Sequence, residues 1–360
     1  MSMTTNSLRK LICRVALVAV AAFSVSALSA QSGYEKNNEI FRIGVEGRLD
    51  YLNQAVAGNH DVAGSGFKVR YFNFRMDGQI SPKFSYSWRQ RFNRANSISE
   101  FAQNTDWFTL TYKPTSNWAI SAGKQVLMIG GWEYDRAPIE LYFCSEFWNN
   151  VNCYQIGASV AYTTNSGNDT ILFQACQSPY DTTSNDVDYY AFNLYWSGSH
   201  GCYTALYSLN FMQYAPGKYD TYLALGNQFT FGDAKLQLDF MNRATDDHAF
   251  FLKDCSVMGE LSYLINNKLN VFGRMTYDVN KTNSVGDLCV LPGTELTRVG
   301  AGLEYYPLKD GNRNLRFHLY ACQAFGKNGN PAGTMLPEQT FVDLGVKFKV
   351  DILSLTNKIF

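Results

Sequence analysis

The sequence predicts an all-β protein, a transmembrane antiparallel β-barrel of about sixteen strands with its third extracellular loop folded inward. Three observations carry this prediction: an aromatic, glycine-rich composition, alternation of apolar and polar residues, and connections that are short and long in turn. The chain has 360 residues, of which 15% are aromatic and 17% are charged. It is too apolar for a disordered chain, and its 23 Tyr, 25 Phe and 28 Gly suit strands and turns rather than helices.

The N-terminal segment has the features of a signal peptide. Three basic residues precede an apolar run that begins at Val15, and small residues offer cleavage sites after Ala27 or Ala30. We expect residues 1–30 to be removed on export and residues 31–360 to form the barrel. Removal leaves Lys+Arg 28 (31 minus 3) against Asp+Glu 31, a mildly acidic balance that argues against a nucleic-acid partner.

Apolar and polar residues alternate with a period of two in nearly every later segment, which is typical of strands. The segments 41–51, 315–322 and 342–350 each place apolar residues on one face and polar residues on the other. A soluble antiparallel sandwich alternates as well, so this pattern alone does not decide the class. No later apolar run reaches the roughly 20 residues of a spanning helix, so a membrane location requires a closed sheet.

The connections favour the barrel over the sandwich. Short turns are expected at 81–83, 113–117, 164–168, 197–201, 232–234, 266–267 and 309–312. Longer connections are expected at about 53–65, 95–104, 127–152, 178–186, 211–218, 244–253, 279–293 and 325–338. Short and long connections alternate along the chain, and both chain ends fall on the short-turn side, as in bacterial outer-membrane barrels.

Closure of the sheet should bring the two ends of the chain together. We expect residues 342–350 to pair with residues 41–51, because an open edge in hydrocarbon would leave backbone groups unsatisfied. The last strand is expected to end near Asp351. Trp118, Tyr112 and Tyr305 should lie near the short-turn side, in an aromatic girdle.

The third long connection, residues 127–152, is expected to fold into the lumen as a constriction. Gly130 and Gly131 allow the chain to turn inward, and the aromatic residues of this segment need a wall to cover them. The charged residues of this loop are Glu133, Asp135, Arg136, Glu140 and Glu146. A surface loop with no role in the pore is the alternative.

Basic residues gather at inward positions of the first three strands. They are Arg42, Arg48, Lys68, Arg70, Arg75, Arg89 and Arg91. A phase slip near residues 71–72 predicts a β-bulge. An acidic loop opposite this basic wall would set up a transverse field across a narrow aqueous opening. The expected facing pairs join Glu133, Asp135 or Glu140 to Arg42, Arg48, Arg89 or Arg91. The alternative for each arginine is a structural ion pair with an inward carboxylate such as Glu46, Asp50 or Asp77.

Four segments of the chain have a familiar sequence: residues 66–80 (GFKVRYFNFRMDGQI), 83–86, 122–125 and 154–158. They resemble the phosphate-selective porin O and P family, particularly members from Bacteroidetes. The resemblance implies a sixteen-stranded, trimeric, water-filled channel for small hydrophilic solutes or ions, with anions such as phosphate as candidates. We therefore expect an outer-membrane location, contact with membrane lipid and lipopolysaccharide, and insertion by the barrel assembly machinery.

Two other functions remain open at this stage. A structural or adhesive barrel would have a plugged lumen, and an outer-membrane hydrolase would need a catalytic constellation. The one local candidate is His248 beside Asp246 and Asp247, without a recognisable serine partner. We expect no enzymatic activity, no cofactor and no metal site, because the histidines and cysteines lack the spacing of a metal site. Cys144 and Cys153 flank the third loop and could pair.

Overall fold

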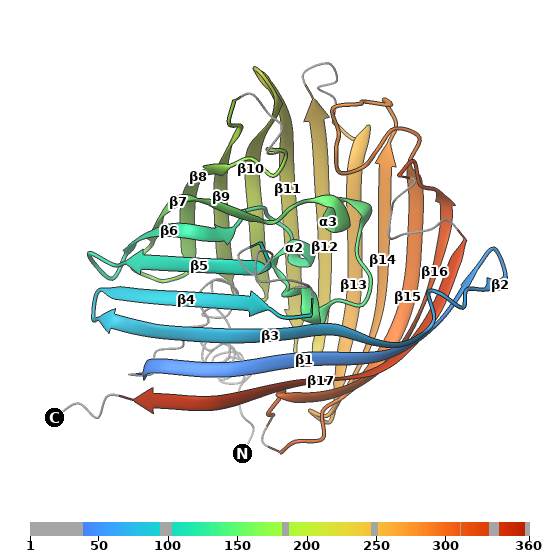
Figure 1. Cartoon of the computed structure of the whole chain (residues 1–360), viewed down its shortest axis with the longest axis horizontal. Coiled ribbons are helices and arrows are strands. Elements are labelled where there is room, and N and C mark those ends of the chain that lie inside the picture. The colour runs from blue at the N-terminus through green and yellow to red at the C-terminus, as the bar shows by residue number, and fades with distance from the viewer. Residues whose placement is uncertain are drawn as a thin grey trace, which may run out of the picture.

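The chain closes into a single antiparallel β-barrel (Figure 1). The computed structural model describes residues 39–93, 103–181, 187–245, 251–309, 311–330 and 338–356. Within these residues, sixteen long strands and the two-residue strand β2 make up the sheet, which confirms the predicted fold class. The expected signal peptide, residues 1–30, and the hydrolase candidate His248 lie outside the described residues.

The strands follow one another around the barrel in chain order, each hydrogen-bonded to its neighbours. Their bounds are β1 Glu39–Val56, β2 Asn59–His60, β3 Gly66–Ser81, β4 Phe84–Arg91, β5 Thr105–Tyr112, β6 Trp118–Val126, β7 Tyr154–Thr163, β8 Asp169–Gln177, β9 Tyr190–His200, β10 Tyr203–Ala215, β11 Lys218–Phe231, β12 Ala234–Thr245, β13 Asp254–Ile265, β14 Leu269–Asn280, β15 Glu295–Tyr305, β16 Leu315–Lys327 and β17 Gln339–Thr356.

The first and last strands close the barrel, as the sequence predicts. Strand β1 pairs with β3 on one side and with β17 on the other, and Val45 lies opposite Val350. The expected end of the last strand near Asp351 is wrong, because β17 continues to Thr356. The reason is that β1 begins at Glu39 and offers backbone partners along this extra length.

Of two local predictions about the strands, one is confirmed and one is wrong. The bulge predicted near residues 71–72 is confirmed, because the β1–β3 register shifts so that Arg70 has no residue opposite it. The long connection expected at 211–218 is wrong. Those residues belong mostly to β10 and β11, which meet at a tight turn through Gly217 at φ 70.

The two faces of the barrel differ in chemistry. Along β16 and β17 the outward residues are apolar and exposed, such as Phe317 at 46% and Leu344 at 57%, whereas Arg316 and Asp343 face inward and are buried. Trp118 and Tyr305 are exposed at the short-turn ends of their strands, where the girdle is predicted. None of the helices in the described part of the chain is long and apolar enough to cross a bilayer.

Replacing Leu344 by Arg should destabilise the barrel by roughly 2 to 4 kcal/mol, because it puts a charge on the lipid face near mid-strand. The matched control is Ile352→Arg, closer to the end of the same strand, which should cost about 0 to 1 kcal/mol. Unfolding free energies measured in lipid vesicles check this difference. Equal stability of both variants would show that Leu344 does not face hydrocarbon.

Candidate functional site

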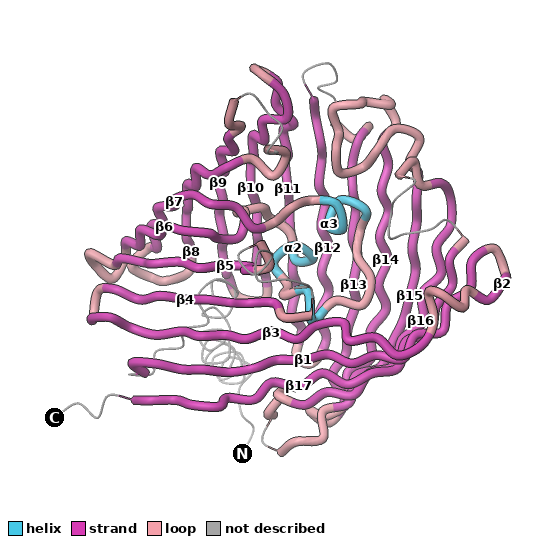
Figure 2. The backbone as a smooth tube through the Cα atoms, viewed as in Figure 1, coloured by secondary structure: helices cyan, strands magenta, loops and turns pink. Residues whose placement is uncertain are grey.

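The third loop lies inside the barrel. Figure 2 shows its helical turns in cyan within the ring of strands. Residues 127–153 connect β6 to β7 and contain α2 (Trp132–Asp135), the 3₁₀ turn η2 (Pro138–Glu140) and α3 (Glu146–Asn150). No bond links Cys144 to Cys153, as both are free thiols.

Glycines let the start of this loop lie directly on the inner wall. The amide of Gly130 donates to Ser208 Oγ at 2.7 Å, and that of Gly131 donates to the Leu206 carbonyl oxygen at 3.1 Å. A Cβ on Gly130 would lie 2.5 Å from the Leu206 carbonyl oxygen, and one on Gly226 would lie 2.6 Å from Gly131 Cα. Gly131 also has φ 109, a conformation that favours glycine. The loop backbone therefore lies against β10 and β11.

Apolar side chains of the loop pack against the barrel wall in three clusters. Leu127, Ile129 and Phe147 join Met212 and Tyr222 in the largest cluster. The members of the second include Met128, Trp132, Leu206 and Met258. The third brings together Phe143, Phe272 and Tyr320. This burial holds the loop in the lumen in the way that its aromatic content predicts.

Ion pairs fix the charged side chains of the loop to β13 and β14. Glu133 pairs with Arg274 and also accepts from the amide of Ser145 at 2.9 Å. Arg136 pairs with Glu260, and Glu260 lies 2.9 Å from Arg274. These groups form a chain of alternating charge, so each buried charge has a partner of opposite sign.

Glu140 joins the loop to β16 and β17. Its carboxylate pairs with Arg316 and with Lys347. Burial by itself would raise the pKa of Glu140, but the charges of Lys347 and Arg316 outweigh it and lower the pKa to about 2. Arg48 donates to the carbonyl oxygens of Ile139 and Leu141, so it binds the backbone of the loop.

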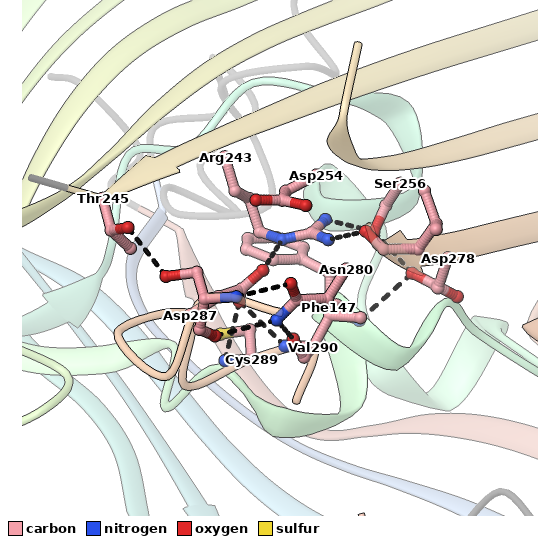
Figure 3. Close-up of polar contacts among 12 residues, drawn as sticks. Phe147, Arg243, Thr245, Asp254, Ser256, Asp278, Asn280, Asp287, Cys289 and Val290 are labelled. Carbon is pink, nitrogen blue, oxygen red and sulfur yellow. Dashed lines mark hydrogen bonds and ion pairs between the residues drawn. The ribbon is translucent and has the colours of Figure 1, made fainter. Parts of the chain in front are cut away.

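The fifth charged loop residue, Glu146, is buried at the start of α3. Its amide donates to Asp278 at 2.8 Å, and its carboxylate accepts from Asn150 at 2.9 Å. A second segment, residues 281–294, packs against this end of the loop. Cys289 and Val290 join Phe147 in one apolar cluster (Figure 3), and Asn150 donates to the Cys289 carbonyl oxygen at 2.7 Å. Arg243 holds that segment through Asp287, with a nitrogen–oxygen distance of 2.6 Å.

Most of the arginines predicted to form the basic wall have local partners. Arg89 and Arg91 share Asp106 on β5, at 2.7 Å and 2.9 Å. Arg75 lies 3.6 Å from Asp77, and Arg42 lies opposite Asp77 in the β1–β3 register. Near the long-loop end, Lys68 donates to the Ala63 carbonyl oxygen and Arg70 lies 3.5 Å from Asp50.

The expected facing ion pairs therefore do not form as predicted. Glu133 and Glu140 contact Arg274, Arg316 and Lys347 on the far strands, and not Arg42, Arg89 or Arg91. The physical reason is that the loop crosses the lumen and packs against β10–β17, where glycines and apolar residues contact its backbone. Arg48 does meet the loop, through backbone carbonyl groups.

An open space separates the loop from the wall of β4–β7. This loop–wall cavity has a volume of about 420 Å³. Arg89, Arg91, Asp106 and Lys124 line it from the wall, and Asp135 and Arg136 line it from the loop. Burial, followed by repulsion from Asp239, raises the pKa of Asp135 to about 7. Of the predicted facing residues, Asp135, Arg89 and Arg91 thus border one cavity.

Several charged residues of this site escaped the sequence prediction. They are Lys124, Arg243, Glu260, Arg274, Arg316 and Lys347. All lie on strands, and the period-two pattern of the later strands already marks Arg316 and Lys347 as members of the polar face. Their partners could not be found this way, because Arg274 and Glu133 are separated by 141 residues.

Comparison with known proteins places this architecture among porins. A family model described as phosphate-selective porin O and P matches residues 41–232. No curated protein sequence matches the chain.

Solved structures with a similar fold share little sequence. An anion-selective porin from Comamonas acidovorans has a TM-score of 0.61 and 13% identity, covering 86% of this chain and 99% of that one. OmpF from Salmonella typhi, in complex with daunomycin, has a TM-score of 0.58 and 12% identity, with 88% and 99% covered. The trimer form of OmpT from Vibrio cholerae has a TM-score of 0.57 and 12% identity, with 87% and 100% covered.

Replacing Arg274 by Met should lower the unfolding free energy by about 3 to 5 kcal/mol, because it leaves the buried Glu133 carboxylate without its cation. The double variant R274M/E133Q should recover part of that loss, since Glu260 keeps Arg136. Urea unfolding in lipid vesicles measures both, with Arg313→Met at a short turn as the control. A double variant no more stable than R274M would refute the pairing.

Proposed function

The chain belongs to the phosphate-selective porin O and P family and is an outer-membrane channel; from this premise we propose that it passes small hydrophilic anions through the loop–wall cavity. The observation that carries the proposal is the charge of the side chains that line this cavity. Four basic side chains, Arg89, Arg91, Lys124 and Arg136, border it, against the two carboxylates of Asp106 and Asp135.

The pairing pattern leaves a positive excess on the wall. Among the lining residues, Arg89 and Arg91 share the single carboxylate of Asp106, so one positive charge of the lining remains, and Lys124 adds a second. Arg136 is compensated by Glu260. Asp135 is only partly ionised near pH 7, since its pKa is raised to about 7. A cavity with this balance favours anions electrostatically.

Phosphate is one anion that suits such a lining. Guanidinium groups bind phosphate oxygens through paired N–H donors, and an ammonium group adds a point charge. The similar porin from Comamonas acidovorans is anion-selective, which supports the proposal. A lumen plugged by its loops is the competing function, and such a barrel would show no conductance.

The same proposal covers the export, membrane insertion and oligomeric state of the protein. Residues 1–30 act as a cleaved signal peptide, and the barrel assembly machinery inserts the chain beside lipid and lipopolysaccharide. The chain forms a homotrimer, for which the trimer form of the similar OmpT structure is support. The channel acts without catalysis. Mass spectrometry of the purified protein tests the cleavage site and the trimer together.

Replacing Arg91 by Gln should shift ion preference toward cations, because it removes one of the excess positive charges and leaves Arg89 with Asp106. The measurement is the reversal potential of single channels across a tenfold KCl gradient. Arg75→Gln is the matched control, because Arg75 lies on the same wall but not among the residues that line the cavity. Equal shifts in both variants, or none in R91Q, would contradict the proposal.

Anion preference should fall as the pH rises from 6 to 8. Asp135 is mostly protonated below its pKa of about 7 and negative above it, so its charge opposes anions only at higher pH. The variant Asp135→Asn should remove this dependence and keep the low-pH selectivity throughout. Reversal potentials recorded at three pH values compare the two proteins. A variant that retains the full pH dependence would assign it to another group.

A further inference from the structure

Three side chains from different strands meet where the barrel closes. Asp50 on β1 lies opposite Gly345 on β17, and Gly345 lies opposite His318 on β16. A Cβ on Gly345 would lie 2.3 Å from Asp50 Oδ1 and 2.6 Å from His318 Nε2. Because Gly345 has no side chain, Asp50 and His318 meet across β17, beside Asp343 of the same strand.

The spacing of these atoms fits a shared cation. His318 Nε2 lies 3.1 Å from Asp50 Oδ1 and 3.4 Å from Asp343 Oδ1, and the three ligand atoms all lie within 4.8 Å of one another. Ligands that hold Zn²⁺ at about 2.0 to 2.2 Å in tetrahedral geometry are separated by roughly 3.3 to 3.6 Å. The cluster thus has suitable ligand types at suitable separations, on three strands of one rigid sheet.

A second observation points to a missing partner. Both carboxylate oxygens of Asp343 are buried and make no hydrogen bond within the described residues, and their nearest guanidinium nitrogens are 3.8 and 3.9 Å away. The side chains of Asp50, His318 and Asp343 have no exposed surface. Buried polar groups are almost always satisfied, and an unsatisfied carboxylate is costly. A cation between the two carboxylates would satisfy Asp343.

Two arginines lie beside the cluster. Arg48 Nη2 lies 2.8 Å from Asp50 Oδ2 and, more loosely, 3.8 Å from Asp343 Oδ2. Arg70 lies farther away, 3.5 Å from Asp50 and 3.9 Å from Asp343, and its side chain is 39% exposed. The two carboxylates thus face two guanidinium groups, one buried and one partly exposed.

We propose that Asp50, His318 and Asp343 form a binding site for one divalent transition-metal cation such as Zn²⁺, which enters from the lumen past Arg70. Imidazole and carboxylate ligands suit this class of ion. The site is independent of the proposed anion path, because none of its three ligands lines the loop–wall cavity.

Zinc binding to the full-length folded channel tests the site. Equilibrium dialysis against micromolar Zn²⁺ should find one ion held through these ligands, and His318→Asn or Asp343→Asn should each weaken its binding by at least about tenfold. The matched control is His200→Gln, which removes an exposed histidine 3.0 Å from a carboxylate and should leave that ion in place. No zinc bound by the wild type, or binding unchanged in both site variants, would overturn the proposal.

A second measurement leaves the site itself intact. The chain has four histidines, so the variant H60Q/H200Q/H248Q keeps His318 alone. With Cu²⁺ as the spectroscopic probe, electron paramagnetic resonance of this folded variant should show coupling to one imidazole nitrogen. Absence of that coupling would overturn the proposal even if the site variants failed to fold.

Discussion

The fold depends on one constraint: hydrocarbon offers no hydrogen-bond partners, so every backbone group of the spanning strands must be paired within the sheet. The pairing of β1 with β17 meets this constraint by joining the two ends of the chain. A barrel of sixteen long strands is then too wide for wall side chains to fill. The lumen is left to be shaped by loops, and those loops need anchors on the wall.

The contacts that anchor the loop lie mostly on one side of the barrel. This asymmetry leaves the loop–wall cavity on the other side. Backbone contact at Gly130 and Gly131, apolar packing, and ion pairs such as Glu133 with Arg274 hold the loop against β10–β17. The opposite wall keeps its own pairs, Arg89 and Arg91 with Asp106, and stands free of the loop. The loop–wall cavity lies between the two, and basic side chains outnumber carboxylates in its lining.

The sequence predicts local properties well and partners poorly. Alternation and turn residues are local, so strand count, closure and the inward loop could be read from them, and Gly130 and Gly131 marked where the chain turns. The expected connection at 211–218 failed because a tight turn through Gly217 needs fewer residues than a polar stretch suggests. The partners of Glu133 and Glu140 depend on which part of the wall the loop packs against. That choice is set by residues far along the chain, such as Leu206 and Gly226, which contact the loop backbone.

The central claim is that the free wall and the anchored loop leave an open path with a positive excess. The most direct measurement is the reversal potential of the unmodified protein in a planar bilayer, across a tenfold KCl gradient at pH 6. The account predicts stable open channels whose reversal potential has the sign of chloride preference over potassium. Potassium preference would contradict the charge balance, and absence of conductance would mean that the loops close the lumen.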